Sequence, residues 1–227
     1  MEQPRTLKDL FDRCNSISYI HDDEQDGDWA YEIIDRTCYL YFQCSASKKD
    51  WINNFFFFAK PYRKMSTKWY CHRGYLRVWK SIKADIRERV FNQHYPQDFD
   101  KICIVGYSHG ASLATIAHEW VWFNFPTLRD KMVGYGFGAT RVYCWWFGYM
   151  RKALKERWEH FYPVRNSLDI VTHCPFNFLG FRHVNKLIKL KKELSGPIKS
   201  HYPEKYQAGL EWFNNRANYK DNFNDKE

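Results

Sequence analysis

The sequence predicts an α/β fold with a mixed, mostly parallel central sheet and flanking helices. Two short apolar runs favour this class: residues 102–105, rich in β-branched side chains, and the glycine-rich residues 132–138. Each has the length and composition of a buried strand. A segment with small residues at helical spacing follows the first run directly, so that strand and helix patterns alternate along the chain.

The N-terminal part predicts a helix followed by a hairpin. Apolar residues recur at helical spacing (Leu7, Leu10, Phe11, Cys14) within residues 7–21, and the acidic residues 22–28 predict a loop. Residues 29–34 and 37–42 alternate apolar and polar side chains on either side of Asp35-Arg36. This pattern predicts a hairpin whose second strand enters the core.

Further helices and strands follow in the middle and C-terminal parts. A long helix packed on the sheet is predicted by helical spacing of the apolar residues Leu76, Val78, Trp79, Ile82, Ile86 and Val90. His72, just before it, is expected to be structural. Residues 150–159 predict another helix, and residues 160–164 another strand.

The bulk composition indicates one globular domain spanning residues 1–227, with 44% hydrophobic residues. The charged N-terminus lacks the apolar core of a secretory signal, and no segment reaches the roughly 18 apolar residues of a membrane span. The 7 cysteines are odd in number and form no C-x-x-C, so we expect reduced thiols in a cytoplasmic protein. Cys103, inside the first apolar run, is expected to be a small core residue.

The net charge of +9 would suit nucleic acid or an anionic membrane face. We favour a solvated charged surface instead, because no nucleic-acid-binding motif accompanies the charge. We therefore expect no nucleic acid partner.

Residues 106–110 read Gly-Tyr-Ser-His-Gly, a complete G-x-S-x-G between the predicted strand and helix. A serine on such a sharp turn presents its hydroxyl above the sheet, and the glycines avoid collisions between a Cβ atom and neighbouring backbone. The N-terminus of the next helix directs N–H groups to the space beside the serine. Ser108 is therefore the predicted nucleophile, with the N–H of His109 as one donor to an oxyanion.

A second segment reads Phe-x-x-Ser and then Ser-x-x-Asp-Trp-x-x-Asn over residues 42–54. It resembles the F-R-G-T…D-W-x-x-N segment of the class 3 lipase family, the fungal triacylglycerol lipase-like α/β hydrolases. The resemblance implies that Ser45 supplies the second oxyanion donor through its N–H and hydroxyl. Gln43 and Cys44 depart from the family pattern, because they stand where the family has arginine and glycine.

Serine nucleophiles need a histidine as base and a carboxylate to orient it, and α/β hydrolases supply them in the order Ser, acid, His. Residues 166–175 resemble the family's N-x-x-D-x-V-x-x-x-P segment, which implies that Asp169 is the acid. The segment around His201 resembles the family's H-x-x-Y segment and favours His201 as the base. His183, in a stretch resembling G-Y-x-H-V, and His173, four residues after Asp169, remain alternatives.

The resemblance runs from about Tyr39 to Leu210 and implies an α/β-hydrolase fold that cleaves carboxylic, acyl-lipid esters through an acyl-enzyme. It implies no cofactor and no metal, and its partners would be a small-molecule or lipid ester and, transiently, a lipid surface. The alternative function is a catalytically inactive binding or scaffold protein. The four phenylalanines at residues 55–58 predict either a buried packing ridge or an aromatic lid, since the family's lid lies in this region.

Overall fold

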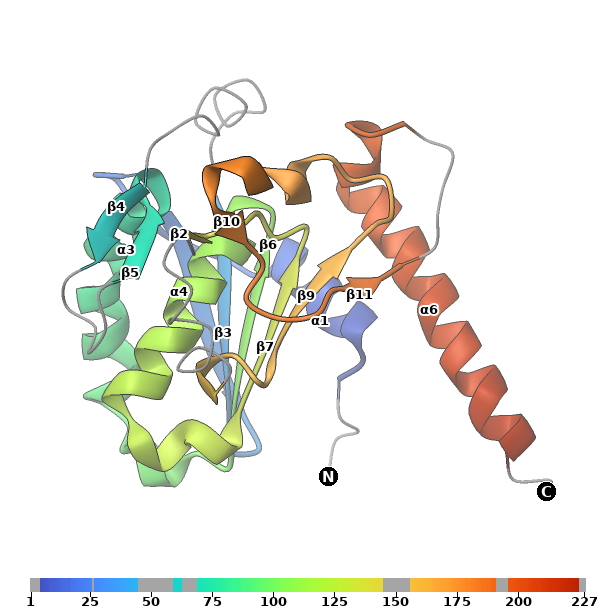
Figure 1. The fold of residues 1–227 in the computed structure, drawn as a ribbon. Coiled ribbons are helices and arrows are strands. Elements are labelled where there is room, and N and C mark those ends of the chain that lie inside the picture. Colours follow the sequence, from blue (N-terminus) through green and yellow to red (C-terminus); the bar gives the residue numbers. More distant parts are fainter. Residues whose placement is uncertain are drawn as a thin grey trace.

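The computed structural model describes residues 5–25, 27–44, 59–62, 69–144, 156–190 and 196–224. Within these ranges the chain forms a 7-stranded central sheet, with helices on both faces, and a 4-stranded smaller sheet (Figure 1). The helices and strands are α1 (Leu7–Ser16), β1 (Ile20–Asp22), β2 (Gly27–Ile34), β3 (Thr37–Cys44), β4 (Ala59–Tyr62), β5 (Trp69–His72), α3 (Arg73–Ile86), η1 (Arg87–Phe91), η2 (Pro96–Asp98), β6 (Lys101–Tyr107), α4 (His109–Asn124), η3 (Pro126–Lys131), β7 (Met132–Phe137), β8 (Tyr143–Cys144), β9 (Phe161–Arg165), η4 (Val171–His173), η5 (Asn177–Leu179), β10 (Phe181–Arg182), β11 (Ile188–Lys189), η6 (Lys199–His201) and α6 (Pro203–Asn224).

The central sheet has the strand order β1-β2-β3-β6-β7-β9-β11 and is mostly parallel, as predicted. Only the hairpin strands β1 and β2 at one edge run antiparallel to their neighbours. In the turn between β2 and β3, Asp35 and Arg36 have φ angles of 46° and 61°, as a two-residue turn matching the strand twist requires. β3 then pairs with β6 inside the sheet, which confirms the predicted hairpin and its path into the core.

Two hydrophobic cores lie on opposite faces of this sheet. The α3/α4 core lies beneath α3 and α4 and contains Ile102 and Ile104 of β6. The α1/α6 core lies beneath α1 and α6 and contains Cys103 and Val105, the alternate residues of the same strand. The continuous apolar run of β6 is therefore explained by burial on both faces, and Cys103 is a core residue as predicted.

The start of α1 is determined by a local motif. The Thr6 hydroxyl accepts a hydrogen bond from the Asp9 N–H at 3.2 Å, and the Asp9 carboxylate accepts one from the Thr6 N–H at 2.8 Å. This reciprocal pair satisfies two N–H groups at the helix end. Leu10, Phe11 and Cys14 are buried against the sheet, as their spacing predicted.

The boundaries after α1 differ from the prediction. α1 ends at Ser16 rather than near residue 21, because the backbone of Ile17 is extended and the chain then pairs with β2 as β1. The predicted acidic loop is also shorter than residues 22–28, since β1 includes Asp22 and β2 begins at Gly27. Pairing between strands therefore overrides the local helical spacing here.

The long helix predicted after His72 is α3, continued by the π-helical turn η1. All six of its predicted apolar positions are buried. His72 is 1% exposed and packs against the Tyr75 ring at 4.2 Å, and burial lowers its pKa to about 4. These contacts agree with a structural role for His72.

Two further predictions from the sequence lie wholly or largely outside the described residues. The four phenylalanines at 55–58 lie outside the described residues, as does most of the helix predicted at 150–159, of which residues 156–157 are helical. The strand predicted at 160–164 is β9, shifted by one residue. No helix in the described ranges has both the length and the apolar character needed to cross a bilayer.

Candidate active site

Ser108 occupies a sharp turn between β6 and α4. Its φ and ψ angles are 55° and −121°, a backbone conformation that is strained for a residue with a side chain. The flanking glycines make this turn possible. A Cβ atom on Gly106 would lie 2.3 Å from the Gly110 carbonyl oxygen, and one on Gly110 would lie 2.0 Å from that of Phe42.

The His201 ring faces this serine. It belongs to the short helix η6, and its Nε2 lies 2.7 Å from the Ser108 Oγ. His201 is 4% exposed, whereas Ser108 is half-buried and remains accessible from solvent. A serine hydroxyl at this distance can pass its proton to an unprotonated imidazole nitrogen.

The carboxylate of Asp169 lies on the far side of the imidazole. Its Oδ2 is 2.8 Å from the His201 Nδ1, and the residue is fully buried in the loop after β9. The Val171 N–H donates to Oδ1 at 2.9 Å, and the Tyr206 hydroxyl donates to Oδ2 at 2.6 Å. The structure therefore brings together Ser108, His201 and Asp169, the three residues predicted to act together.

Two tyrosines that the sequence did not assign to the site hold this arrangement. The Tyr206 hydroxyl contacts the carboxylate of Asp169, and the Tyr107 hydroxyl donates to the backbone carbonyl of His201. The Tyr107 ring also stacks on the imidazole, with centroids 5.6 Å apart and an interplanar angle of 20°. Burial raises the pKa of both phenols, and the nearby Asp169 charge raises them further, so both hydroxyls remain donors.

A partial signal for Tyr206 was present in the sequence. The H-x-x-Y pattern would place a tyrosine at position 204, where Glu204 stands, and the tyrosine that reaches the carboxylate comes two residues later. For Tyr107 the only signal was its place beside the serine. Neither contact could be read from spacing, because the partners come from distant parts of the chain.

The two other histidines considered as the base have partners other than Ser108. The His183 Nε2 is 2.8 Å from the Thr172 carbonyl oxygen, and burial lowers the pKa of His183 to about 4. The His173 Nε2 lies 3.0 Å from an Arg165 nitrogen, and burial, followed by the charge of that guanidinium, lowers its pKa. Of the three candidates, His201 is the one that contacts Ser108.

The predicted oxyanion donors are only partly within the described residues. His109 is the first residue of α4, so its N–H lies beside Ser108, and its ring contacts Tyr75 at 4.9 Å. Ser45 lies outside the described residues. The end of β3 nevertheless borders the turn, because Phe42 pairs with Gly106 across the parallel strands.

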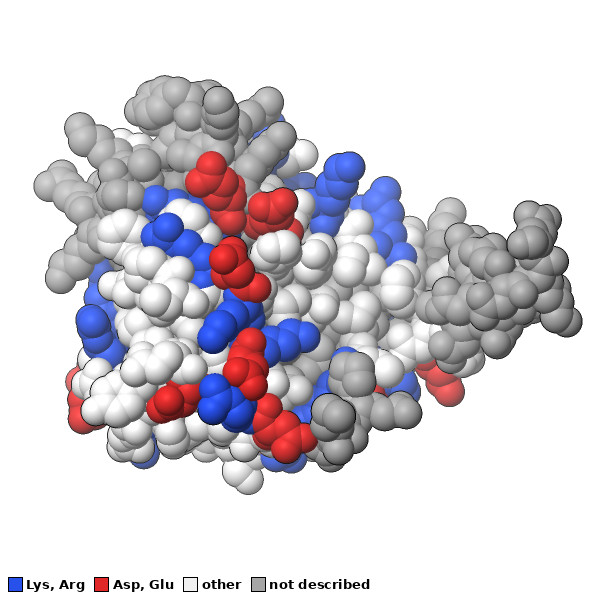
Figure 2. All heavy atoms as spheres, turned by 90° about the horizontal axis from the view of Figure 1, so that it is seen from below, with Lys and Arg blue, Asp and Glu red and all other residues white. Residues whose placement is uncertain are grey.

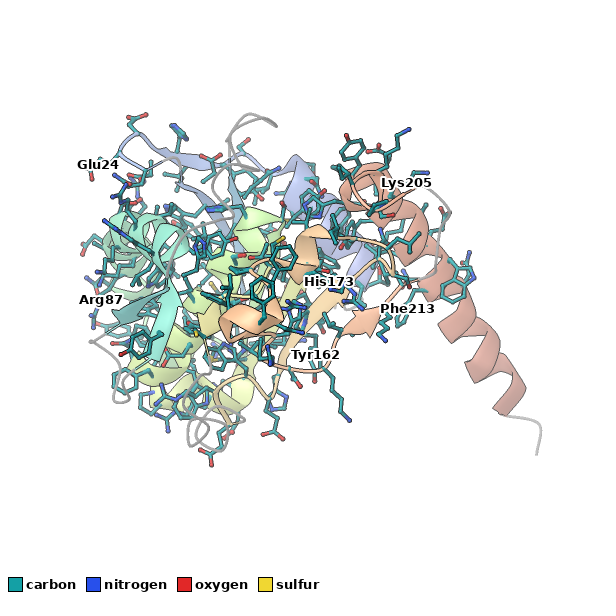
Figure 3. All side chains as sticks on the ribbon, turned by 45° about the horizontal axis from the view of Figure 1, so that its top comes forward. Glu24, Arg87, Tyr162, His173, Lys205 and Phe213 are labelled. Carbon is teal, nitrogen blue, oxygen red and sulfur yellow. The ribbon has the colours of Figure 1, made fainter. Side chains whose placement is uncertain are left out.

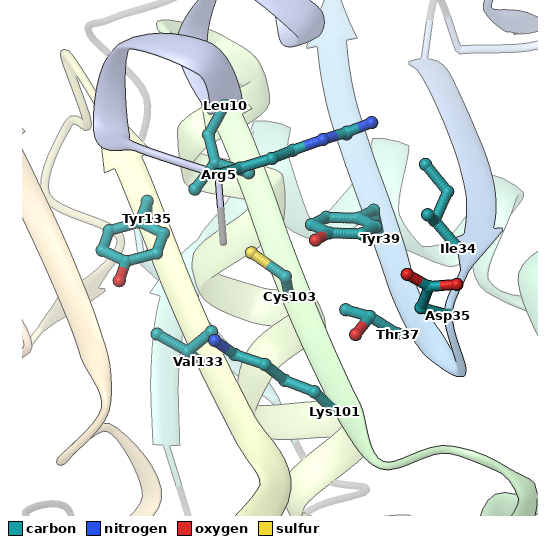
Figure 4. A pocket seen from close by; sticks show the side chains of 10 residues that line it. All are labelled: Arg5, Leu10, Ile34, Asp35, Thr37, Tyr39, Lys101, Cys103, Val133 and Tyr135. Atoms are coloured by element: carbon teal, nitrogen blue, oxygen red, sulfur yellow. The ribbon is translucent and has the colours of Figure 1, made fainter. Parts of the chain in front are cut away.

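A cavity of about 220 Å³ lies away from these residues, between α1 and the amino-terminal halves of β3, β6 and β7 (Figure 4). Its lining includes Arg5, Tyr39, Lys101 and Tyr135, and none of the three residues of the hydrogen-bonded chain. It is therefore distinct from the candidate active site. Within the described part of the chain, no group of three or more His, Cys, Asp or Glu side chains is placed to hold a metal ion.

Comparisons with known proteins agree with this fold. A family model described as lipase (class 3) matches residues 39–179, which is more than half of the chain. A comparison with curated proteins finds no match.

Several solved structures are similar in fold. Rhizomucor miehei lipase in its propeptide complex is 20% identical with a TM-score of 0.66, over 86% of this chain and 66% of that one. Lipase II from Rhizopus niveus is 22% identical with a TM-score of 0.64, over 73% and 62% of the two chains. Mono- and diacylglycerol lipase from Aspergillus oryzae is 19% identical with a TM-score of 0.62, over 77% and 63%.

This chain therefore spans slightly less than two thirds of the length of these lipases. At such identities the similarity shows the fold, which is the α/β-hydrolase fold implied by the sequence resemblance. Since the family model matches more than half of the chain, this chain belongs to the class 3 lipase family.

Proposed function

We propose that this chain hydrolyses carboxylic esters of lipids through an acyl-enzyme. The observation that carries the proposal is the continuous hydrogen-bonded chain from the Ser108 Oγ through the His201 imidazole to the Asp169 carboxylate. Its links measure 2.7 and 2.8 Å, so a proton can move from the hydroxyl while the imidazole keeps its orientation. Family membership supports the same class of reaction.

In the first half of the reaction, the Ser108 Oγ attacks the ester carbonyl carbon while His201 Nε2 takes the hydroxyl proton. The tetrahedral intermediate collapses, and the imidazolium returns that proton to the departing alcohol. In the second half, water attacks the acyl-enzyme with His201 as its base, which releases the fatty acid and restores the serine. Asp169 holds the Nδ1 proton and stabilises the imidazolium in both halves.

The oxyanion of each intermediate needs donors that are already in place, commonly contributing about 3 to 4 kcal/mol per donor. We assign one to the N–H of His109, at the positive end of α4. The second assignment, Ser45, follows from the family resemblance and from the path of β3 beside the serine turn. No cofactor takes part in this scheme.

The substrate class follows from the relatives. The similar structures include a triacylglycerol lipase and a mono- and diacylglycerol lipase, so acylglycerols are the first esters to test. A series of p-nitrophenyl and glyceryl esters with graded acyl length would identify the preferred chain. The expected outcome is turnover that depends on acyl length and requires Ser108.

Labelling of the pure protein by a fluorophosphonate, with mass spectrometry of the modified peptide, tests the mechanism. We expect one modification at Ser108 and none in Ser108→Ala. Activity of Ser108→Ala on the best ester should fall by about 10³-fold or more. Full activity in Ser108→Ala would refute the proposal.

The second candidate function is a catalytically inactive relative that acts as a binding or scaffold protein. Gln43 and Cys44 motivate it, because they replace the arginine and glycine of the family's oxyanion loop. Absence of labelling in folded wild-type protein, together with no turnover of any ester, would favour this candidate over the enzyme.

A further inference from the structure

Three arginines near the end of β9 have no acidic partner among the described residues. Arg141 follows β7, Arg165 is the last residue of β9, and Arg182 lies in β10. We call these three residues the arginine cluster. In the described part of the chain, the arginines that pair with Asp or Glu are Arg5, Arg13, Arg36, Arg89 and Arg157.

The members of the arginine cluster all contact one short loop. The Arg141 Nη1 donates to the His173 carbonyl oxygen at 2.6 Å, and the Arg165 Nη1 lies 3.0 Å from the His173 Nε2. The Arg182 Nη1 donates to the Asn177 carbonyl oxygen at 2.7 Å. Three positive charges are therefore gathered around a loop that supplies neutral groups as their partners.

Burial makes this charge costly. Arg141 is only 6% exposed, and the Nε of Arg165 is buried without a hydrogen-bond partner among the described residues. Burial, followed by the charge of Arg182, lowers the pKa of Arg141. Arg77 and Arg87 also form no ion pair within the described ranges, but they are exposed on α3 and η1, where water solvates them. A buried charge needs a partner of opposite sign, which the arginine cluster lacks.

The neighbouring sequence offers few acids that could neutralise the cluster. Asp169 is the one Asp or Glu in residues 160–190, and its carboxylate is already bonded within the candidate active site. Glu159 precedes β9 and thus lies at the opposite end of that strand from Arg165. The next acid after residue 190, Glu193, lies outside the described residues.

Another face of the molecule shows how charges are balanced elsewhere. On the face seen from below, Lys and Arg lie beside Asp and Glu along the centre (Figure 2). Near the arginine cluster a further cation is added instead, because the exposed Lys189 is the register partner of Arg165 in β11. An excess of cations around buried guanidinium groups is the electrostatic signature of an anion site.

Phosphate suits the donors that remain in the cluster. The contacts with the loop use the Nη1 atoms, so the Nη2 atoms are left as donors. Guanidinium groups bind phosphate through paired, charge-assisted hydrogen bonds, and several of them together favour a double negative charge. Arg165 and His173 are half-buried and Arg182 is exposed, so an anion can approach from solvent. The enclosed space beside Arg182 and His183 is only about 10 Å³, room for a single water, so the anion would bind on the solvent side.

We propose that the arginine cluster binds a phosphate dianion, either inorganic phosphate or a phosphomonoester. The anion supplies the missing negative charge and joins guanidinium groups that otherwise repel one another. The loop that they contact continues from the acid of the candidate active site, where the Val171 N–H donates to the Asp169 Oδ1. Bound phosphate therefore stabilises this loop and, with it, the folded protein. The site does not rest on the proposed function.

The binding test is isothermal titration calorimetry of the full chain with inorganic phosphate at about pH 8, where phosphate is mostly a dianion. Chloride keeps the ionic strength constant. We expect one saturable site, and a rise in the midpoint of thermal unfolding that follows the same saturation. Dimethyl phosphate, which carries a single charge, should bind at least tenfold more weakly. Glycerol 3-phosphate distinguishes the two sources: binding as tight as that of phosphate identifies phosphomonoesters, and weaker binding identifies inorganic phosphate.

Two single variants test the residues of the cluster. Arg165→Gln and Arg182→Gln should each weaken phosphate binding at least tenfold, because a hydrogen bond to a charged group contributes about that much. Arg141 is left unchanged, since its Nη1 holds the backbone of the loop. The matched control is Arg87→Gln, which removes the same charge from an exposed position and should leave binding unchanged. In Figure 3, Arg87 lies at the left edge of the view and His173 near its centre.

The variants decide the outcome, because phosphate at high concentration stabilises folded proteins in general. Circular dichroism must show that each variant is folded, and Arg182→Gln, which changes an exposed side chain, suffices if Arg165→Gln is not. Absence of saturable binding to wild type, unchanged binding in the cluster variants, or an equal loss in Arg87→Gln would overturn the proposal. Ester turnover tests the proposed function separately: phosphate binding without turnover would retain the site and reject the enzyme.

Discussion

Two regions of the molecule each bury a histidine, His72 and His201, and the surroundings of these two rings differ. In the α3/α4 core, the nitrogens of His72 have no hydrogen-bond partner among the described residues, and burial lowers the pKa of this ring to about 4. In the α1/α6 core, the phenols of Tyr107 and Tyr206 extend to the sheet edge and bond with His201 and Asp169. One histidine is therefore enclosed in apolar surroundings, while the other is enclosed within a polar network.

The difference explains why burial alone does not produce a base. Desolvation without a partner keeps an imidazole neutral, since charging it would cost free energy in an apolar environment. Beside a buried carboxylate, the imidazolium is stabilised when it forms. The α3/α4 core should thus determine stability, and the α1/α6 core should also determine activity.

The largest expected effect concerns the carboxylate itself. Asp169→Asn should lower kcat on the best ester by about 10³- to 10⁴-fold, because the amide favours the wrong tautomer of His201. Fluorophosphonate labelling of Ser108 should slow in parallel. A loss smaller than tenfold in folded protein would mean that the polar network is not needed for the chemistry.

A substitution in the α3/α4 core should lower the stability of the protein without lowering its activity. Leu128 is fully buried in the α3/α4 core, in η3, at the opposite end of α4 from Ser108. Leu128→Ala should lower the free energy of unfolding by about 2 to 5 kcal/mol, measured in urea. Turnover per folded molecule at low temperature should stay within about twofold of wild type. A large loss of turnover would remove the distinction between the two cores.

The tyrosines allow a matched pair of variants. Tyr206→Phe removes a bond to the Asp169 carboxylate. Tyr41→Phe removes a bond of 2.9 Å to Glu32 and one of 2.6 Å from Arg5, neither of them to Ser108, His201 or Asp169. Each should cost about 1.5 to 3 kcal/mol of stability, because the bond involves a charged group. Only Tyr206→Phe should also lower kcat, by about tenfold, with little change in KM. Equal kcat in the two variants would show that Tyr206 is merely structural.

The smallest effect is a pH dependence of stability. Between pH 6.5 and about 4 the unfolded chain protonates His72 while the folded chain does not, so stability falls as pH falls through this window. His72→Phe removes this term and keeps the ring against Tyr75. The free energy of unfolding of this variant minus that of wild type should therefore be about 2 kcal/mol more positive at pH 5 than at pH 7. A constant difference across that range would contradict the assignment.

The sequence by itself determined the features that depend on neighbouring residues. The strand of β6, the glycines around Ser108 and the start of α4 form one continuous stretch of sequence, so their pattern could be recognised locally. Gly106 is required by the backbone of Gly110 within that stretch, although Gly110 is required by Phe42 of β3. The hairpin turn and the buried face of α3 were likewise predictable from residue type and period. The choice of Asp169 followed from the resemblance of residues 166–175 to the family's segment.

Tertiary structure decided what depends on distant pairs. His201 and Ser108 are 93 positions apart, and His201 contacts the serine because the folded chain places η6 beside the turn after β6. His173 and His183 have other partners, Arg165 and the Thr172 carbonyl. The same packing brings Tyr206 to Asp169. Spacing along the chain cannot report these results, because the free energy of each contact depends on which surfaces the folded sheet brings together.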